Sequence, residues 1–362
     1  MELDWLELIG YRCYPNLRFE PAPGVNVLVG NNGTGKTSVL EAIAYLGLLH
    51  SFRGTPDESI VSTEAASAVL RGGFSVPSGT VRVEVELPKN GRRTILLNGK
   101  RPKRNRDVLA QVPVVAFQPD DLDVVKRGPS LRRGYLDDLA AQLRPQAAAD
   151  QQEHQRALRQ RNALLRQEGR SADRESLDAW DARVTAAGAS VFVDRLRVLE
   201  ALEIHLGEAY RLVGASGSLT WSYLSNWGAA PGDDLATAEA KLSDAMTKRR
   251  QRDLDQRTTT AGPHRDDPTL VVDGRPARAM ASQGEQRTIA VSLRVGAYRL
   301  LAQERPTLPI LLLDDVFSEL DPLRARGVLD LLGDGQVFVT TARDDDVPLD
   351  GTRWMVEGGA LR

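Results

Sequence analysis

The sequence has one cysteine, Cys13, in 362 residues. A single cysteine excludes a disulfide within the chain and the paired cysteines of a zinc hook, and it suits a reducing compartment. No apolar run approaches the roughly 20 residues of a membrane span. Residues 1–5 lack the basic and apolar regions of a secretory signal. We therefore expect a soluble, cytoplasmic protein without a membrane partner.

The chain also lacks an excess of either charge. Lysine and arginine total 47 against 49 acidic residues, which gives a formal net charge of −2. This balance excludes no class of partner, because the opposite charges are segregated along the chain. The length predicts two domains, or one domain with a large insertion. The hydrophobic fraction of 41% is enough for cores in a chain of this size.

What the sequence does have is a phosphate-binding pattern near its start. Residues 25–29 predict a short buried strand and residues 39–46 a helix. The segment between them fits G-x-x-x-x-G-K-[ST] and consists of Gly30, Asn31, Asn32, Gly33, Thr34, Gly35, Lys36, Thr37 and Ser38. Glycines let successive N–H groups face phosphate oxygens, and the helix N-terminus adds a favourable dipole. Lys36 would reach the β- and γ-phosphates and Thr37 would ligate Mg²⁺. The strand, loop and helix together disfavour the alternative, a glycine turn without a ligand.

Polar side chains follow three further predicted strands. They are Gln118 after residues 112–117, Asp314 and Asp315 after residues 310–313, and Thr340 and Thr341 after residues 336–339. Ligands bind at such strand ends in open α/β sheets. In the functional interpretation, Asp314 binds Mg²⁺ directly or through water, and Asp315 orients or deprotonates the attacking water. The threonines would contact the γ-phosphate. A simple loop residue at Gln118 and a helix cap at the aspartates are the alternatives.

A second helix start occurs at Ser282, which has Glu285 three residues later. This spacing predicts a capping box, and a capped helix start with Gly284 is also an anion site. The polar group 262–267, which contains His264 and Arg265, is interpreted as structural.

The rest of the chain predicts hairpins and a helical insertion. Residues 3–9 and 17–19 form one expected hairpin, with Arg12 on its turn. Residues 81–87 and 94–97 form another, with Asn90-Gly91 as the turn. From 131 to about 255, two long antiparallel helices at 147–167 and 177–212 are expected, separated by the glycine-bearing segment 168–171. Strand-like sequence returns at 269–274.

Two basic runs are candidates for contacts to DNA phosphates, and a solvated hairpin face is the alternative for the first of them. The first comprises Arg92, Arg93, Lys100, Arg101, Lys103, Arg104 and Arg106, and the second Lys248, Arg249, Arg250 and Arg252.

These motifs stand in the order of an ABC-type ATPase, and four segments (117–139, 262–267, 282–287 and 311–321) resemble the RecF family of bacterial DNA replication and repair proteins. The resemblance implies an α/β fold: an ABC-type P-loop ATPase head with a mixed sheet, plus a mainly helical inserted lobe. Residues 1–125 and 256–362 would form the head, and 126–255 the helical lobe.

The resemblance also implies roles for individual residues. Catalysis would use Asp315, Lys36 and Gln118, and the metal site Thr37, Asp314 and Gln118. The nucleotide would contact the phosphate loop, Arg12 and Thr340, together with a signature motif of Ser282, Gly284, Glu285 and Gln286 and the D-loop residue Asp321. Asp315 stands where many ABC ATPases carry glutamate, and a hydroxyl stands where histidine is frequent, so slow turnover is expected.

The implied function is an ATP-driven dimer that binds single- and double-stranded DNA independently of sequence, in the nucleoid, with weak DNA-stimulated ATP hydrolysis. It would act with RecR and RecO in loading RecA at gaps. The main alternative is the ATPase subunit of a membrane transporter, which would carry Leu-Ser-Gly-Gly-Gln where this chain has Ser282-Gln283-Gly284-Glu285. A structural SMC tether would need longer arms, and a P-loop kinase would need an acceptor lid.

Overall fold

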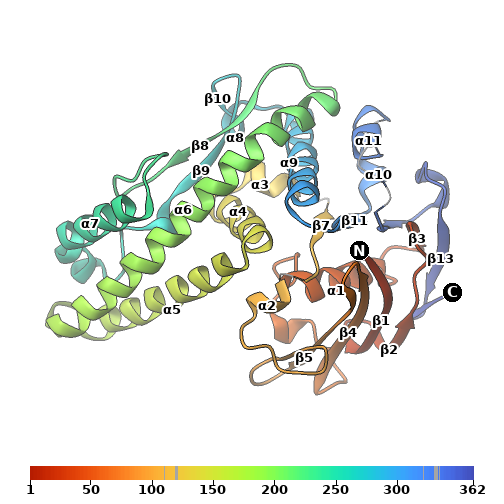
Figure 1. The fold of residues 1–362 in the computed structure, drawn as a ribbon, viewed down its shortest axis with the longest axis horizontal. Coiled ribbons are helices and arrows are strands. Elements are labelled where there is room, and N and C mark those ends of the chain that lie inside the picture. The colour runs from red at the N-terminus through yellow and green to blue at the C-terminus, as the bar shows by residue number, and fades with distance from the viewer. Residues whose placement is uncertain (110, 119–120, 321, 330–332, 334) are drawn as a thin grey trace. The chain divides into compact units, whose positions relative to one another are not determined.

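The structure is a computed structural model that describes all residues except 110, 119–120, 321, 330–332 and 334 (Figure 1). Its contacts divide the chain into two units. Unit 1 comprises residues 1–122, 208–216 and 287–362, and unit 2 comprises residues 123–207 and 217–286. The domain limits inferred from the sequence stay a prediction. They differ from the units mainly in residues 208–216 and 256–286.

A mixed six-stranded sheet carries the phosphate loop in unit 1. Its strand order is β14-β13-β3-β12-β11-β7. The strands are β3 (Val25–Val29), β7 (Val114–Phe117), β11 (Ile310–Asp314), β12 (Val337–Thr341), β13 (Thr352–Glu357) and β14 (Ala360–Leu361). Every pair is parallel except β13 with β14. The apolar runs of β11 and β12 are buried throughout, because helices and other layers cover both faces of such a sheet.

The register of this sheet brings distant polar residues to one edge. Asp314 pairs with Thr340 on the neighbouring strand, and Thr340 pairs with Leu28 of β3. The chain leaves β3 for the phosphate loop directly after Val29. The carboxyl ends of three parallel strands therefore converge on the loop.

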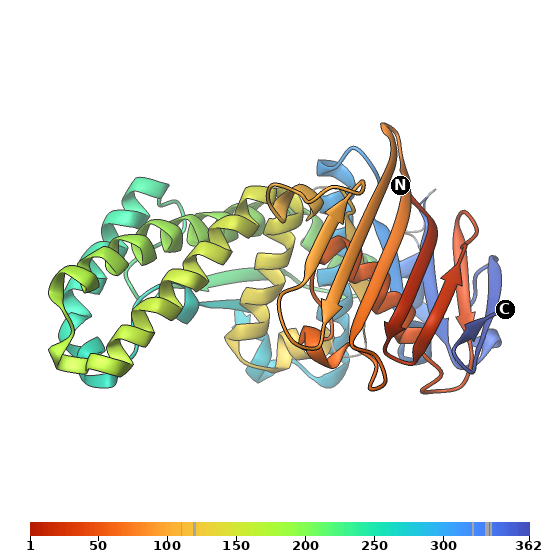
Figure 2. The ribbon, with the colours of Figure 1, turned by 90° about the horizontal axis from the view of Figure 1, so that it is seen from below.

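A second sheet in unit 1 is antiparallel, in the order β2-β1-β4-β5-β6. Figure 2 shows its red to orange strands side by side. They are β1 (Glu2–Tyr11), β2 (Tyr14–Phe19), β4 (Ser67–Val76), β5 (Gly79–Pro88) and β6 (Thr94–Leu97). Both hairpins expected from the sequence are present.

Strand β4 was not predicted from the sequence, and its glycine pair explains why. Gly72 and Gly73 usually weaken a strand pattern. Here the Trp5 side chain lies over Gly73, where an added Cβ would come 2.2 Å from the indole nitrogen. Gly73 thus allows the Trp5 ring to approach the strand closely, and it does not mark a turn.

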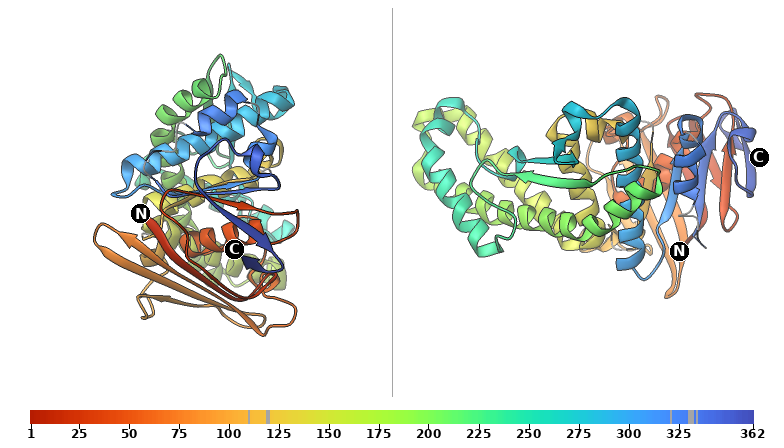
Figure 3. Two further views of the ribbon diagram at one scale, coloured as in Figure 1. Left: turned by 90° about the vertical axis from the view of Figure 1, so that its right-hand side faces the viewer. Right: turned by 90° about the horizontal axis from the view of Figure 1, so that it is seen from above.

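Helix α1 (Lys36–Leu48) contacts strands of both sheets, namely β4 and β5 of one and β7, β11 and β12 of the other (Figure 3, left). Eleven of its 13 residues are buried, as expected for a helix covered on all sides. The described part of unit 1 also includes α2 (Arg106–Leu109), α10 (Val316–Glu319), α11 (Pro322–Leu329), the main part of α9 (Gln283–Glu304) and the last residues of α6 (Arg174–Leu212).

Unit 2 is mainly helical. Its longer helices are α4 (Pro129–Leu143), α5 (Pro145–Glu168), α7 (Leu235–Gln256) and most of α6 (Arg174–Leu212), and α3 (Leu122–Lys126) and α8 (Ala277–Met280) are short. The two long helices expected from the sequence correspond to α5 and α6, and the break between them falls at Gly169 with a φ of 54°.

Unit 2 also contains a three-stranded antiparallel sheet, in the order β10-β9-β8. The sequence placed residues 219–224 in the helical stretch, but they form β8 (Leu219–Leu224). The strand expected at 269–274 runs instead as β9 (Asp267–Val272), which a turn at Asp273 and Gly274 joins to β10 (Arg275–Pro276). Alternation in residues 219–224 is the strand signal, and the surrounding helical sequence hid it.

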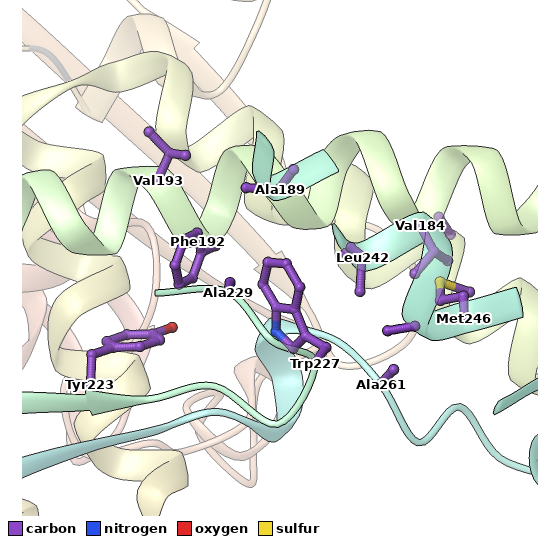
Figure 4. Packing of buried hydrophobic residues seen from close by; sticks show 13 residues of the cluster. Val184, Ala189, Phe192, Val193, Tyr223, Trp227, Ala229, Leu242, Met246 and Ala261 are labelled. Atoms are coloured by element: carbon purple, nitrogen blue, oxygen red, sulfur yellow. The ribbon is translucent and has the colours of Figure 1, made fainter. Parts of the chain in front are cut away.

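The core of unit 2 joins helices, strands and loops. Phe192 of α6 packs edge-on against Tyr223 and Trp227, with ring centroids 5.4 and 5.0 Å apart (Figure 4). Leu242 and Met246 of α7 belong to the same buried cluster. This aromatic and aliphatic packing fixes β8 and its following loop against the helices.

Three helices of unit 2 are also joined through one buried arginine. The Arg161 side chain of α5 is fully buried, and its Nη1 donates to Asp253 Oδ2 of α7 at 2.8 Å. Its Nε donates to Asp181 of α6. Removing one partner of such a buried group would leave an uncompensated charge.

Candidate nucleotide-binding site

The phosphate loop lies between β3 and α1, as its pattern predicts. Gly33 and Gly35 have φ values of 83° and 107°, which residues with a Cβ rarely adopt. Gly35 caps α1, and Val39 N donates to its carbonyl at 3.2 Å. The loop thus turns its backbone into the start of a 13-residue helix, which favours an anion there.

The lysine of the loop is held by the loop itself. Lys36 Nζ donates to the carbonyls of Gly30 at 2.6 Å and Asn31 at 2.9 Å. Burial lowers the pKa of Lys36, while the nearby Asp315 and Asp314 oppose this change. The loop carbonyls therefore hold the ammonium group beside a cavity that both strand-end carboxylates also line.

Asp314 is the centre of a small hydroxyl cluster. Its Oδ1 accepts hydrogen bonds from Thr37 Oγ1 at 2.8 Å and Thr340 Oγ1 at 2.7 Å. Burial raises the pKa of this carboxyl, and the two hydroxyl donors and Arg53 act in the opposite direction. A carboxylate and hydroxyl oxygens are the hard donors that Mg²⁺ binds. The residues present therefore fit a magnesium ion.

Asp315 has an unusual backbone for a residue with a side chain. Its φ is 51°, and its N–H donates to Thr340 Oγ1 at 2.9 Å. Among the residues that the structure describes, its Oδ1 is buried without a hydrogen-bond partner. Such left-handed residues concentrate at functional sites. An acceptor oxygen is thus available next to the cluster.

A cavity of about 570 Å³ opens over these groups, within the size range of small-molecule sites. It brings together the loop and both aspartates, and it is lined by Arg12, Cys13, Asn32, Gly33, Gly35, Lys36, Thr37, Ser38, Arg53, Asp314, Asp315 and Thr340.

Two arginines line this cavity, and only one of them was expected from the sequence. Arg12 was expected, and it stands on the β1–β2 turn with a φ of 51°. Arg53 was not expected, because no motif surrounds it. It is exposed, follows α1 by five residues, and lies close enough to Asp314 to lower the pKa of that carboxyl.

Gln118 lies beside a second, smaller cavity of about 40 Å³, which it shares with Asp315 and Val316. Its backbone N–H donates to Asp121 Oδ2 at 2.9 Å, and its Nε2 to Phe52 O at 3.5 Å. It does not line the larger cavity. Its metal and catalytic roles stay predictions.

The residues expected to form the signature motif belong to unit 2. Ser282 N donates to Glu285 Oε2 at 2.7 Å, and Glu285 N donates to Ser282 Oγ at 3.3 Å, so the predicted capping box is present. Gln286 Nε2 donates to Ala281 O at 2.9 Å. Ser282, Gly284 and Glu285 are exposed. The expected D-loop residue Asp321 lies outside the described residues.

The basic residues expected to contact DNA differ in how exposed they are. In the first run, Arg92, Lys100, Arg101, Lys103 and Arg104 are exposed and Arg106 is half-buried. Arg93 instead donates to Tyr45 Oη at 3.0 Å and to Leu49 O.

In the second run, three of the basic side chains make polar contacts within unit 2. Lys248 pairs with Asp244 at 2.6 Å. Arg249 donates to Thr260 O at 2.9 Å, and Arg250 to Asp181 Oδ2 at 2.6 Å.

The polar group 262–267 is built into the core of unit 2, as its structural interpretation predicts. Asp266 Oδ2 accepts from Tyr223 Oη at 2.9 Å, and Oδ1 from Trp227 Nε1 at 3.0 Å. Burial raises the pKa of Asp266 to about 6. His264 lies 5.8 Å from His154, measured between ring centroids.

None of the helices in the described part of the chain is long and apolar enough to span a bilayer.

The chain is similar to known proteins over nearly its whole length. The family model "RecF/RecN/SMC N terminal domain" matches residues 2–349. A "DNA replication and repair protein RecF" of Acidothermus cellulolyticus is 39% identical, with 98% of each chain covered. The protein of the same description in Frankia alni is 37% identical, with 100% and 99% covered.

Solved structures are similar to this chain as well. A structure of "the recombination mediator protein RecF-ATP in RecFOR pathway" matches with a TM-score of 0.92 and 29% identity, covering 99% of this chain and 96% of that one. An Smc head domain from Pyrococcus furiosus, at 17% identity and a TM-score of 0.53 with 99% and 95% covered, shows the fold alone. These relatives do not favour a transporter subunit. The chain belongs to the RecF family of DNA replication and repair proteins, with the fold of an ABC-type ATPase head that carries a mainly helical second unit.

Proposed function

We propose that this chain is an ATP-dependent DNA-binding protein of recombinational repair and replication restart, and that ATP hydrolysis resets it. The observation that carries the proposal is the convergence of Lys36, Thr37 and Asp314 on one cavity. The ATP-bound relative supports ATP as the nucleotide.

In this proposal, the phosphate loop and Lys36 bind the phosphates, and Arg12 and Arg53 add positive charge at the cavity wall. Thr37 and Asp314 would hold Mg²⁺, with Gln118 as a further candidate. Bound there, Mg²⁺ would offset the charge that phosphoryl transfer spreads over the phosphate oxygens.

Asp315 would orient the attacking water. Its unpartnered oxygen and left-handed backbone support this role. The shorter side chain of aspartate, compared with glutamate, supports slow hydrolysis that DNA would stimulate.

The functional form would be an ATP-dependent homodimer. A phosphate loop surrounds its ligand from one side only. A two-fold partner could present the capped helix start at Ser282, with the exposed Gly284 backbone, to the other side. ATP would then stabilise the dimer because it contacts both chains only when the dimer is closed.

DNA would be bound through phosphates, independently of sequence, at gaps and junctions of single and double strands. The exposed residues of the first basic run, around Lys103 and Arg104, are the best supported contacts. The names of the structural relatives support action with RecO and RecR, and loading of RecA would be the result. Residues 1–125 and 256–362 as ATP lobe, with 126–255 as helical lobe, remain part of the proposal.

The test is Lys36→Met with the exposed Lys126→Met as a matched control. Titration calorimetry with ATP and Mg²⁺ should show loss of binding in the first variant and unchanged binding in the second. DNA binding that depends on ATP should be lost with it. Wild-type ATP affinity in Lys36→Met would overturn the assignment.

A further inference from the structure

A buried glutamate stands on the phosphate-loop helix, five residues after its lysine. The side chain of Glu41 has no solvent exposure. Its two oxygens accept from Arg12 in a bidentate arrangement, Nε to Oε2 at 2.9 Å and Nη2 to Oε1 at 2.7 Å. Ser51 Oγ donates to Oε1 as well, at 2.5 Å. From the sequence, Glu41 was only one of several helix formers.

Arg12 is held from its other side too. Its Nη1 donates to Ser59 O at 3.3 Å, and its backbone N–H to Ile60 O at 2.9 Å. A guanidinium has five N–H groups. These bonds use three of them, one on each nitrogen, and Tyr11 is a further neighbour that raises the pKa of Arg12. Arg12 also lines the candidate nucleotide cavity, and a guanidinium can bind two oxygens of a phosphate at once.

The second arginine of the cavity is connected to the same glutamate. Ser51 Oγ, while donating to Glu41, accepts from the backbone N–H of Arg53 at 3.1 Å. This hydrogen bond fixes the backbone of Arg53, whose side chain lines the cavity beside Asp314. One carboxylate therefore anchors the arginines of two separate loops.

We propose that Glu41 is a positioning residue of the nucleotide site, which holds Arg12 directly and Arg53 through Ser51 in the positions where they meet phosphate oxygens. The inference rests on the proposed function and adds to it a residue that touches no ligand. Its physical basis is preorganisation: an arginine already fixed by a bidentate partner loses less freedom when it binds.

A buried ion pair with a purely structural role is the competing explanation. The two differ in what a second substitution does. If Glu41 acts through Arg12, its replacement adds little once Arg12 is gone. If Glu41 only stabilises the fold, the two losses of ATP affinity are independent and multiply.

The first experiment is a double-mutant cycle of Glu41→Gln and Arg12→Ala. ATP affinity is measured by calorimetry, and the melting temperature without nucleotide is measured in parallel. We expect Glu41→Gln to weaken ATP binding about tenfold, the size of a lost hydrogen bond to a charged group, and to raise KM more than it lowers kcat. In the double variant only the part of the effect that passes through Ser51 to Arg53 should remain, so it should bind ATP at most about threefold more weakly than Arg12→Ala. A folded Glu41→Gln with wild-type affinity, or multiplying losses, would overturn the proposal.

The second experiment does not depend on Glu41→Gln being folded. Ser51→Ala leaves the Arg12–Glu41 pair and cuts only the connection to Arg53. ATP binding should weaken about threefold, a fraction of one hydrogen bond, and this effect should vanish in an Arg53→Ala background. Ser75→Ala, which removes an exposed hydroxyl of β4, should bind normally. An equal Ser51→Ala effect with and without Arg53 would contradict the connection.

Failure of this inference is distinguishable from failure of the nucleotide site. If Lys36→Met loses ATP while the Glu41 and Ser51 variants bind normally, the site stands and the positioning role is wrong. If Lys36→Met binds ATP like the wild type, the site itself is wrong, and with it the proposal for Glu41.

Discussion

The hydroxyl of Thr37 donates a hydrogen bond of 2.8 Å to Oδ1 of Asp314, although 277 positions separate the two residues in the chain. The contact joins the first residues of α1 to the end of β11. Thr340 donates to the same oxygen from the end of β12. A loop, a helix start and two strand ends therefore meet at one carboxylate.

Asp314→Asn should remove the effect of Mg²⁺ on ATP binding. A neutral amide keeps the shape of the site but does not balance a divalent cation. We expect ATP affinity with Mg²⁺ to fall to the value that the wild type shows with a chelator, as measured by calorimetry. Asp346→Asn, at an exposed acid after β12, is the matched control. A variant that still gains affinity from Mg²⁺ would place the metal elsewhere.

Asp315→Asn should separate binding from hydrolysis. Asparagine tolerates a positive φ, so the backbone at 51° can persist, and Thr37 and Asp314 are unchanged. ATP binding should be retained while hydrolysis falls about 100-fold or more, and the ATP-bound complex with DNA should last longer. Single-turnover assays measure the rate, and hydrolysis at the wild-type rate would move the role to another residue.

Ser282→Arg should leave ATP binding to the monomer intact but abolish dimerisation and turnover. The larger, charged side chain stands at the exposed helix start that the partner's nucleotide would approach. Sedimentation with ATP and Mg²⁺ measures dimerisation. Mixing this variant with Lys36→Met should restore one intact site per heterodimer. A strictly monomeric protein with wild-type hydrolysis would exclude a composite site.

Charge reversal of Lys103 and Arg104 together should weaken DNA binding and reduce its dependence on salt. Each lost phosphate contact lowers the slope of log affinity against log salt by about 0.9 in duplex DNA, so two contacts lower it by about 1.8. Titrations at several salt concentrations measure the slope, and Lys126→Glu is the control. An unchanged slope would move the DNA site away from this run.

His154 should make the protein less stable at acidic pH. Burial, with His264 and Arg195 nearby, lowers its pKa to about 3 in the folded state. Below pH 6.5 the unfolded chain binds a proton that the folded chain does not, so stability present at pH 7 is lost as the pH falls. The difference is about 2 kcal/mol at pH 5. Urea unfolding at both pH values should show a smaller loss in His154→Gln, and an equal loss would contradict the assignment.

The sequence by itself determined the features that adjacent residues encode. Gly33, Gly35 and Lys36 form a contiguous pattern whose backbone geometry follows from residue type. The apolar runs before Asp314 and Thr340 predicted buried strands, and Gly169 marked the break between two long helices. Ser282 and Glu285 predicted their own capping box, because both partners lie within one turn.

The tertiary structure alone decided which distant side chains meet. Sequence order did not reveal that Arg12 and Ser51 share Glu41, that Arg53 lies beside Asp314, or that β4 carries Gly73 under Trp5. The strand β8 was likewise hidden within helical sequence. The reason is physical: such contacts depend on strand register and on how layers pack around α1, and a register shift of one residue turns a side chain to the opposite face.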